Sequence, residues 1–161
     1  MSIETWELLS YVVTVIGLPL AIAVFLYEKR QERNNEEEEV YELLSGSYHD
    51  FLKLALENPD LRLLSKSRTG DLTAEQRERM EAIFGLLIAL FERAYLLLYE
   101  ADLAGKEARR WRSWEDFMQE WCGRDDFREA MPGLLHGEDP EFAAYLKRLA
   151  DGVGRTQGEA A

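Results

Sequence analysis

Few residues of this chain are of the types that carry chemistry, and they do not fall into a recognised pattern. The two histidines, His49 and His136, lie far apart, and His49 precedes Asp50 as an i, i+1 neighbour that would not share its helix face. The single cysteine, Cys122, has no histidine at a diagnostic spacing, so we interpret it as a small buried hydrophobic residue beside Trp121. One cysteine permits no internal disulfide, and a reducing compartment is compatible with the chain.

Glu92 is the only acidic residue embedded in a strongly apolar stretch, because Ile83 to Phe91 carry no polar side chain. A carboxyl group in such a place could have a raised pKa and a functional role. The alternative is a structural ion pair or hydrogen bond, for which one of the arginines between 109 and 112 is the candidate partner. We favour the structural interpretation and predict that Glu92 is a buried polar residue.

The short motifs of common catalytic and cofactor sites are missing from the sequence. It has no phosphate-binding glycine loop, no G-x-S-x-G, no H-E-x-x-H and no pair of Glu-x-x-His motifs for a di-metal bundle site. The acidic run Glu36 to Glu39 is interpreted as a solvated helix face, because consecutive carboxylates point around a helix and not at one centre. We therefore predict no catalytic residue, no cofactor, no metal and no enzymatic activity.

The element that organises the chain is the uncharged stretch Leu8 to Tyr27, LLSYVVTVIGLPLAIAVFLY. As a helix it would be about 30 Å long, which is the thickness of the hydrocarbon core of a bilayer. Twelve of its twenty residues are Leu, Val, Ile or Phe, and together they favour insertion by about 4–7 kcal/mol as an upper bound. Trp6 and Tyr27 lie at its two edges, where aromatic rings favour the headgroup region. The pattern predicts one transmembrane helix.

Three other interpretations of this stretch are weaker. Ala21-Ile22-Ala23 resembles a signal-peptide cleavage site, but the leader has Glu4 and Glu7 and no basic residue, and the apolar run continues past the site. A buried core helix usually has a polar stripe, and an interfacial helix needs a charged face. The stretch has neither feature.

The charges that flank the stretch predict its orientation. Lys29, Arg30 and Arg33 follow it closely and no Lys or Arg precedes it, so the N-terminus should face outward and the body should lie in the cytoplasm, at the inner (plasma) membrane. The whole chain has a net charge of −12, which disfavours nucleic acid as a partner because phosphate would be repelled. The expected contacts are the lipid bilayer and another protein.

A stripe of small residues follows one face of the predicted span. Ser10, Thr14, Gly17 and Ala21 are spaced 4, 3 and 4 residues apart, which is the surface that lets two membrane helices approach closely. Small residues are common in membrane helices, so chance remains an equal explanation. We predict these four residues as the partner-binding face, either for another membrane protein or for self-association.

Two long helices are expected in the first half of the body. Apolar residues from Val40 to Ala55 recur at helical spacing up to Asn58-Pro59, and this helix could continue from the membrane. T-A-E-Q at Thr73 is a capping box that begins a helix to about Ala104, with Gly105 as a left-handed stop. Insertion of this second apolar helix would gain about 3–6 kcal/mol, whereas its central Glu and Arg cost about 5–7, so we predict a central helix covered on most sides.

The second half of the body should contain shorter helices. S-x-x-D from Ser113 predicts a helix start, and the aromatic face that follows is more typical of a core than of a ligand site. That face consists of Trp114, Phe117, Met118 and Trp121, whereas Trp111 lies outside it and could face the membrane surface. Asp139-Pro140-Glu141 predicts the start of a last helix that stops at Gly152.

With these segments in view, the chain resembles a bacterial family known only as a domain of unknown function. Members of that family have one N-terminal membrane helix followed by a small helical cytoplasmic region, so the resemblance implies that architecture and supplies no catalytic residue. The matching segments are the anchor with its basic flank, Asn58-Pro59-Asp60-Leu61, Phe91-Glu92-Arg93-Ala94-Tyr95 with Tyr99, the tryptophan segment from Trp111, and Pro140-Glu141-Phe142-Ala143-Ala144-Tyr145.

The sequence thus predicts an all-α protein with a single N-terminal transmembrane helix and a small cytoplasmic helical bundle. We expect an anchor over residues 1–33, a bundle over 34–152 and a disordered tail over 153–161. The favoured function is that of a membrane-anchored, non-enzymatic interaction module, an accessory or structural subunit of a larger membrane complex. The alternatives are a homo-oligomeric membrane assembly, such as a pore or signalling unit, and a membrane-tethered enzyme with an unrecognised site.

Overall fold

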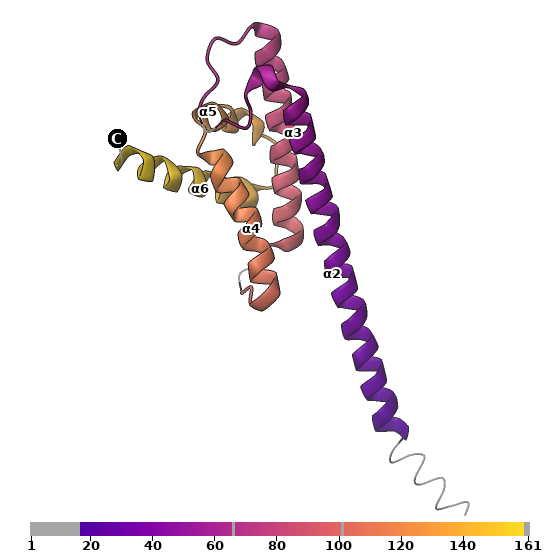
Figure 1. Ribbon diagram of the computed structural model, residues 1–161. Helices are drawn as coiled ribbons and strands as arrows, with labels where there is room; N and C mark the ends of the chain where they lie inside the picture. The colour runs from indigo at the N-terminus through magenta and orange to yellow at the C-terminus, as the bar shows by residue number, and fades with distance from the viewer. Residues whose placement is uncertain (1–16, 66, 101, 160–161) are drawn as a thin grey trace, which may run out of the picture. The chain divides into compact units, whose positions relative to one another are not determined.

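The computed structural model describes residues 17–65, 67–100 and 102–159 of the 161-residue chain, and every regular element in those ranges is a helix (Figure 1). The predicted all-α fold is confirmed. In chain order the elements are α2 (Leu18–Glu57), the short 3-10 helix η2 (Pro59–Leu61), α3 (Ala74–Leu98), α4 (Gly105–Cys122), α5 (Asp125–Leu134) and α6 (Pro140–Glu159).

The internal contacts of the chain divide it into two units, with the boundary inside α2. One unit extends to Glu42 and the other begins at Leu43, whereas the composition places the end of the anchor after residue 33. In the described part of the first unit, the residues from Gly17 to Arg33 are all exposed. The second unit contains the hydrophobic core and the other helices.

Among the described residues, none of the helices combines the length and the apolar character that crossing a membrane requires. The predicted span begins at Leu8, and residues 8–16 of it lie outside the described residues.

Helix α2 is continuous over forty residues and passes through Asn34-Asn35 without a break, as the sequence suggested. It ends at Glu57 because Pro59 restricts the residue before it to extended conformations. The Asn58 side chain donates to the carbonyl oxygen of Leu54 at 2.8 Å and satisfies one of the acceptors that the helix end leaves free.

The predicted capping box at the start of α3 is confirmed. The backbone N–H of Gln76 donates to Thr73 Oγ1 at 3.2 Å, and the Thr73 N–H donates to Gln76 Oε1 at 2.9 Å. The predicted end of this helix is wrong: α3 stops at Leu98, and Tyr99 is already extended. Gly105 has the predicted left-handed φ of +60°, but it begins α4 and does not end α3.

Helix α4 begins eight residues before the predicted start at Ser113. That serine lies within the helix, and its hydroxyl donates to the carbonyl oxygen of Arg109, so S-x-x-D is not a cap here. Trp111 is 6 % exposed and belongs to the core, which excludes the membrane-surface position considered for it. The predicted aromatic face is correct, since Trp114, Met118 and Trp121 are buried and Phe117 is half-buried.

Helix α6 begins where the sequence predicts and ends later. Asp139 Oδ1 accepts the N–H groups of Glu141 and Phe142 at 3.0 and 2.9 Å, which is the expected N-cap. The helix does not stop at Gly152, because it runs to Glu159. The predicted disordered tail from residue 153 is therefore helical up to that residue.

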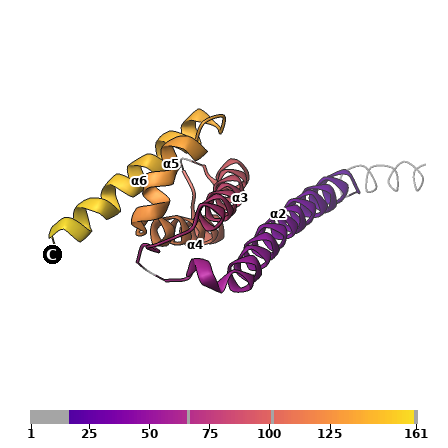
Figure 2. The same cartoon turned by 90° about the horizontal axis from the view of Figure 1, so that it is seen from above.

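The core of the second unit is an aromatic cluster to which several helices contribute. Helix α3 contacts α4, α5 and α6, and α4 also contacts α5 and α6 (Figures 1 and 2). Phe84 of α3 meets Phe127 of α5 edge-on with ring centroids 5.2 Å apart, and Tyr48 of α2 stacks on Phe117 of α4 at 4.4 Å. Each fully buried ring contributes about 1.5–3 kcal/mol of hydrophobic stabilisation.

Candidate functional site

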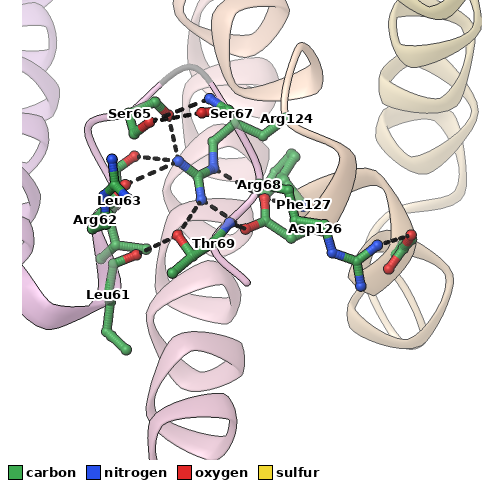
Figure 3. Close-up of polar contacts among 11 residues, drawn as sticks. Leu61, Arg62, Leu63, Ser65, Ser67, Arg68, Thr69, Arg124, Asp126 and Phe127 are labelled. Atoms are coloured by element: carbon green, nitrogen blue, oxygen red, sulfur yellow. Dashed lines mark hydrogen bonds and ion pairs between the residues drawn. The ribbon is translucent and has the colours of Figure 1, made fainter. Parts of the chain in front are cut away.

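Among the described residues of the second unit, the most deeply buried charge is Arg124, directly before α5 (Figure 3). Its side chain is 3 % exposed and that of Asp126 is 6 % exposed. Arg124 Nε donates to Asp126 Oδ1 at 3.0 Å, and Nη2 donates to Oδ2 at 2.7 Å. This two-point pairing is the strongest arrangement open to a guanidinium and a carboxylate.

The remaining donors of the guanidinium bind the segment that follows η2 (Figure 3). Nη1 donates to the carbonyl oxygens of Arg62 at 3.1 Å, Leu63 at 3.0 Å and Ser65. Nη2 also donates to Thr69 Oγ1 at 3.4 Å. Arg62 has a left-handed φ of 46°, and this turn directs its carbonyl group toward the arginine.

Asp126 binds the same segment from the other side. One carboxylate oxygen accepts the Thr69 N–H at 3.1 Å, and the other accepts the Phe127 N–H at 3.0 Å. The Thr69 hydroxyl donates onward to the Leu61 carbonyl oxygen at 2.7 Å. The pair therefore ties the connection between η2 and α3 to the start of α5.

The bonding of Arg124 and Asp126 is typical of a structural ion pair and not of a catalytic site. Arg124 uses Nε, Nη1 and Nη2 on protein acceptors, and Asp126 uses both oxygens on protein donors. A substrate would have to displace these bonds inside a buried environment. The cavity beside it, about 250 Å³, is lined by charges of both signs, and two of them, Arg68 and Glu129, already pair at 2.7 Å.

Glu92 is half-buried, whereas the sequence predicted a buried residue. Its Oε1 accepts the backbone N–H of Asp139 at 2.5 Å, so it holds the start of α6 against α3. This hydrogen bond agrees with the structural interpretation of Glu92, but its donor is a backbone amide and not the suggested arginine. The neighbouring Glu138 shares a hydrogen bond with Glu92, and this bond is the main cause of the raised pKa of Glu138.

A second polar contact lies in a group of aromatic rings near the C-terminal end of α3. The Tyr145 hydroxyl donates to Glu115 Oε1 at 2.5 Å, and its ring lies 5.7 Å from Trp111 and 5.3 Å from Tyr99. Burial is the main cause that raises the pKa of Tyr145, and the carboxylate acceptor raises it further. The phenol thus stays protonated and serves as a donor.

The other candidates for chemistry do not come together. Cys122 is fully buried, and burial raises the pKa of its thiol to about 12, so the thiolate that a nucleophile requires is suppressed. His49 and His136 are both exposed. No group of three or more His, Cys, Asp or Glu residues within the described ranges could hold a metal ion.

The predicted partner-binding face is described only in part. Ser10 and Thr14 lie outside the described residues, whereas Gly17 and Ala21 are exposed near the start of α2. The surface around them is apolar, and its large side chains are between 47 % and 69 % exposed: Leu18, Leu20, Ile22, Val24, Phe25, Leu26 and Tyr27.

Sequence reasoning missed Arg124 and Asp126. Besides Asp126, the Nη1 and Nη2 atoms of Arg124 bind four oxygens, and three of these belong to backbone carbonyls, which every residue has. The bonds join positions that are 55 to 62 residues apart. The only local signal was an arginine and an aspartate two positions apart beside a helix start. That signal does not distinguish a buried pair from an exposed one.

Comparison with protein-family models, curated proteins and solved structures finds no match to this chain.

Proposed function

We propose that this protein is a membrane-anchored, non-enzymatic interaction module that acts as an accessory or structural subunit of a larger membrane complex. The observation that carries the proposal is the exposed apolar surface from Leu18 to Tyr27 at the start of α2, followed by Lys29, Arg30 and Arg33. An apolar surface of this extent on a helix requires a cover of lipid or protein.

The anchor is the whole stretch from Leu8 to Tyr27, of which the exposed surface is the second half. The basic residues after it favour an orientation with the N-terminus outside and the body in the cytoplasm. Fusion of a reporter after Ala161 tests this orientation. A reporter that requires the cytoplasm should be active there, whereas activity of a reporter that requires the opposite side would overturn the topology.

The contact with the partner is the stripe of small residues. Lipid chains provide no hydrophobic drive between helices, so association depends on close packing, for which Gly17 and Ala21 leave room. Replacing both with leucine should preserve insertion and reduce recovery of the partner from gently solubilised native membranes. The matched control replaces Ala23 with leucine, which adds the same kind of side chain on the opposite side of the helix from the stripe. Undiminished recovery with the double leucine variant would reject the stripe as the contact.

A binding role also accords with the chemistry of the body. The buried arginine and carboxylate are paired with each other, and the thiol is held in its protonated form. The acidic surface of the chain disfavours nucleic acid and anionic lipid headgroups as ligands, which favours protein.

A further inference from the structure

One face of α3 carries apolar side chains that remain largely exposed, although α2 lies beside part of it. Leu86 and Leu96 are each 59 % exposed, and Ala82, Ala89 and Arg93 are exposed on the same face. The opposite face of the helix is buried, with Phe84, Leu87 and Phe91 at 1 % exposure or less. The expectation that other helices cover α3 on most sides is therefore correct for one face and wrong for the other.

The spacing of this face is that of a coiled-coil seam. Residues 82, 86, 89, 93 and 96 are separated by 4, 3, 4 and 3 positions, which is the a/d pattern of a heptad. A strict a/d stripe is narrower than the face with which a helix joins a globular core, and it fits one partner helix. We therefore expect another helix to pack against this seam, which consists of Ala82, Leu86, Ala89, Arg93 and Leu96.

The single charge of the seam determines which pairing is possible with a second copy. In a parallel pair, Arg93 would face Arg93 of the other copy, and two like charges in one layer repel. In an antiparallel pair centred near Phe91, Leu86 faces Leu96 of the second copy. Ala89 then faces Arg93 of that copy, so a large side chain lies over a small one in each layer.

The groove beside Ala89 supplies the opposite charge. Asp50 and Leu54 of α2 line it together with Ala89 and Arg93 of α3, and its volume is about 360 Å³. None of the ion pairs between described residues involves Arg93. The bond of Asp50 to Lys53 is exposed, so the carboxylate can accept a second cation.

We propose that the seam of α3 pairs antiparallel with the same seam of a second copy, and that Arg93 of each copy crosses Ala89 of the other to reach its Asp50. Arg93 and Asp50 give this face charges of both signs, whereas the chain as a whole has a net charge of −12 and repels its own copies elsewhere. The inference does not rest on the membrane anchor, because it uses only residues of the second unit.

A charge exchange on the full-length protein tests the pair. Wild type should have twice the mass of one chain by light scattering in a mild detergent at micromolar concentration. R93E and D50R should each weaken the dimer by about tenfold or more, and the double variant D50R/R93E should restore it, because the opposite charges meet again. K147E on α6 changes the net charge by the same amount as R93E and should leave the dimer intact.

Cross-linking tests the direction of the pairing. L86C and L96C proteins mixed with each other should give a dimer with a short thiol cross-linker, and either protein alone should not. The native Cys122 is fully buried, so the introduced thiols are the exposed ones. Q119C, exposed on α4, is the control position and should not cross-link.

A monomeric wild type would overturn the proposal, as would a dimer that both charge variants leave unchanged. Cross-linking of L86C alone would show a parallel pair and would also reject it. Membrane fractionation tests the anchor independently of the dimer, and R93E should remain in the membrane fraction. If wild type were absent from that fraction, the proposed function would be rejected, whereas the proposed dimer would not.

Discussion

Arg124 and Asp126 are two positions apart in the chain and form a buried two-point ion pair that is also hydrogen-bonded to the segment from Arg62 to Thr69. A buried pair contributes to stability only when both partners are present and fully bonded, because the cost of removing each charge from water is large. Here the backbone of a connecting segment completes the bonding. The stability of the fold and the position of that segment are therefore linked.

Removing one member of this pair should be far more harmful than removing an exposed one. We expect Asp126→Ala to lower the free energy of unfolding by about 3–5 kcal/mol, because it leaves Arg124 buried without its carboxylate. The control is Glu129→Ala, which breaks the exposed pair with Arg68 and should cost at most about 1 kcal/mol. Urea unfolding followed by tryptophan fluorescence measures both. Equal losses in the two variants would show that the Arg124–Asp126 pair is not the stabilising one.

The capping box of α3 gives a smaller and more local prediction. Thr73→Ala should destabilise the protein by about 1 kcal/mol, since it removes the side-chain acceptor for the Gln76 N–H. Thr73→Ser keeps that oxygen and should retain most of the stability. The thermal midpoint of each variant is the measurement, and an alanine variant that melts with the serine variant would contradict the role of the hydroxyl.

The buried thiol of Cys122 should be unreactive in the folded protein. Burial raises its pKa from 9.0 to about 12, so alkylation by iodoacetamide should not accelerate between pH 7 and pH 10 as it does for an exposed cysteine. Since the folded pKa is the higher one, the related stabilisation is fully present below about pH 9 and is lost as the pH rises toward 12. Rapid alkylation at pH 8 without unfolding would show that the thiol is accessible.

The contact between Glu92 of α3 and Glu138, just before α6, should make stability fall as the pH rises. The hydrogen bond with Glu92 raises the pKa of Glu138, so the protonated form is the one that the fold favours, and its contribution is lost above that pKa. Glu138→Gln imitates the protonated group and should stabilise the protein at pH 8 by about 0.5–1 kcal/mol, with little change at pH 4. Thermal midpoints across this range measure the effect, and parallel curves for variant and wild type would exclude it.

Local signals predicted local structure well. The capping residues Thr73 and Asp139 have their predicted roles because each bond joins positions within one helical turn. Ser113 shows the limit of this reasoning, since its S-x-x-D pattern lies inside α4, where packing of the aromatic face extends the helix past a weak start signal. The prediction that the last helix stops at Gly152 is wrong for a similar reason, because one glycine costs a helix only about 1 kcal/mol.

Contacts between distant segments could not be predicted. The partner of Glu92 is a backbone amide 47 positions away, and no side-chain type marks it. The exposure of the α3 seam could not be predicted for another reason. A helix that is apolar on all sides is expected to be buried, but its composition does not show whether the same chain or another molecule packs against it.

The hydrogen bonds of Arg124 also affect how the folded chain unfolds locally. The connection after η2 has the composition of a flexible loop, and such loops are usually the first sites of proteolytic cleavage and hydrogen exchange. Here five positions from Arg62 to Asp126 are joined through one guanidinium, which closes a ring of more than sixty residues without a covalent bond. Unlike a disulfide, these bonds are absent from the unfolded chain, so they restrict only the folded chain, in which they tie the loop to α5. Cleavage after Arg62 should therefore await the opening of α5, so that a surface loop reports the stability of the core.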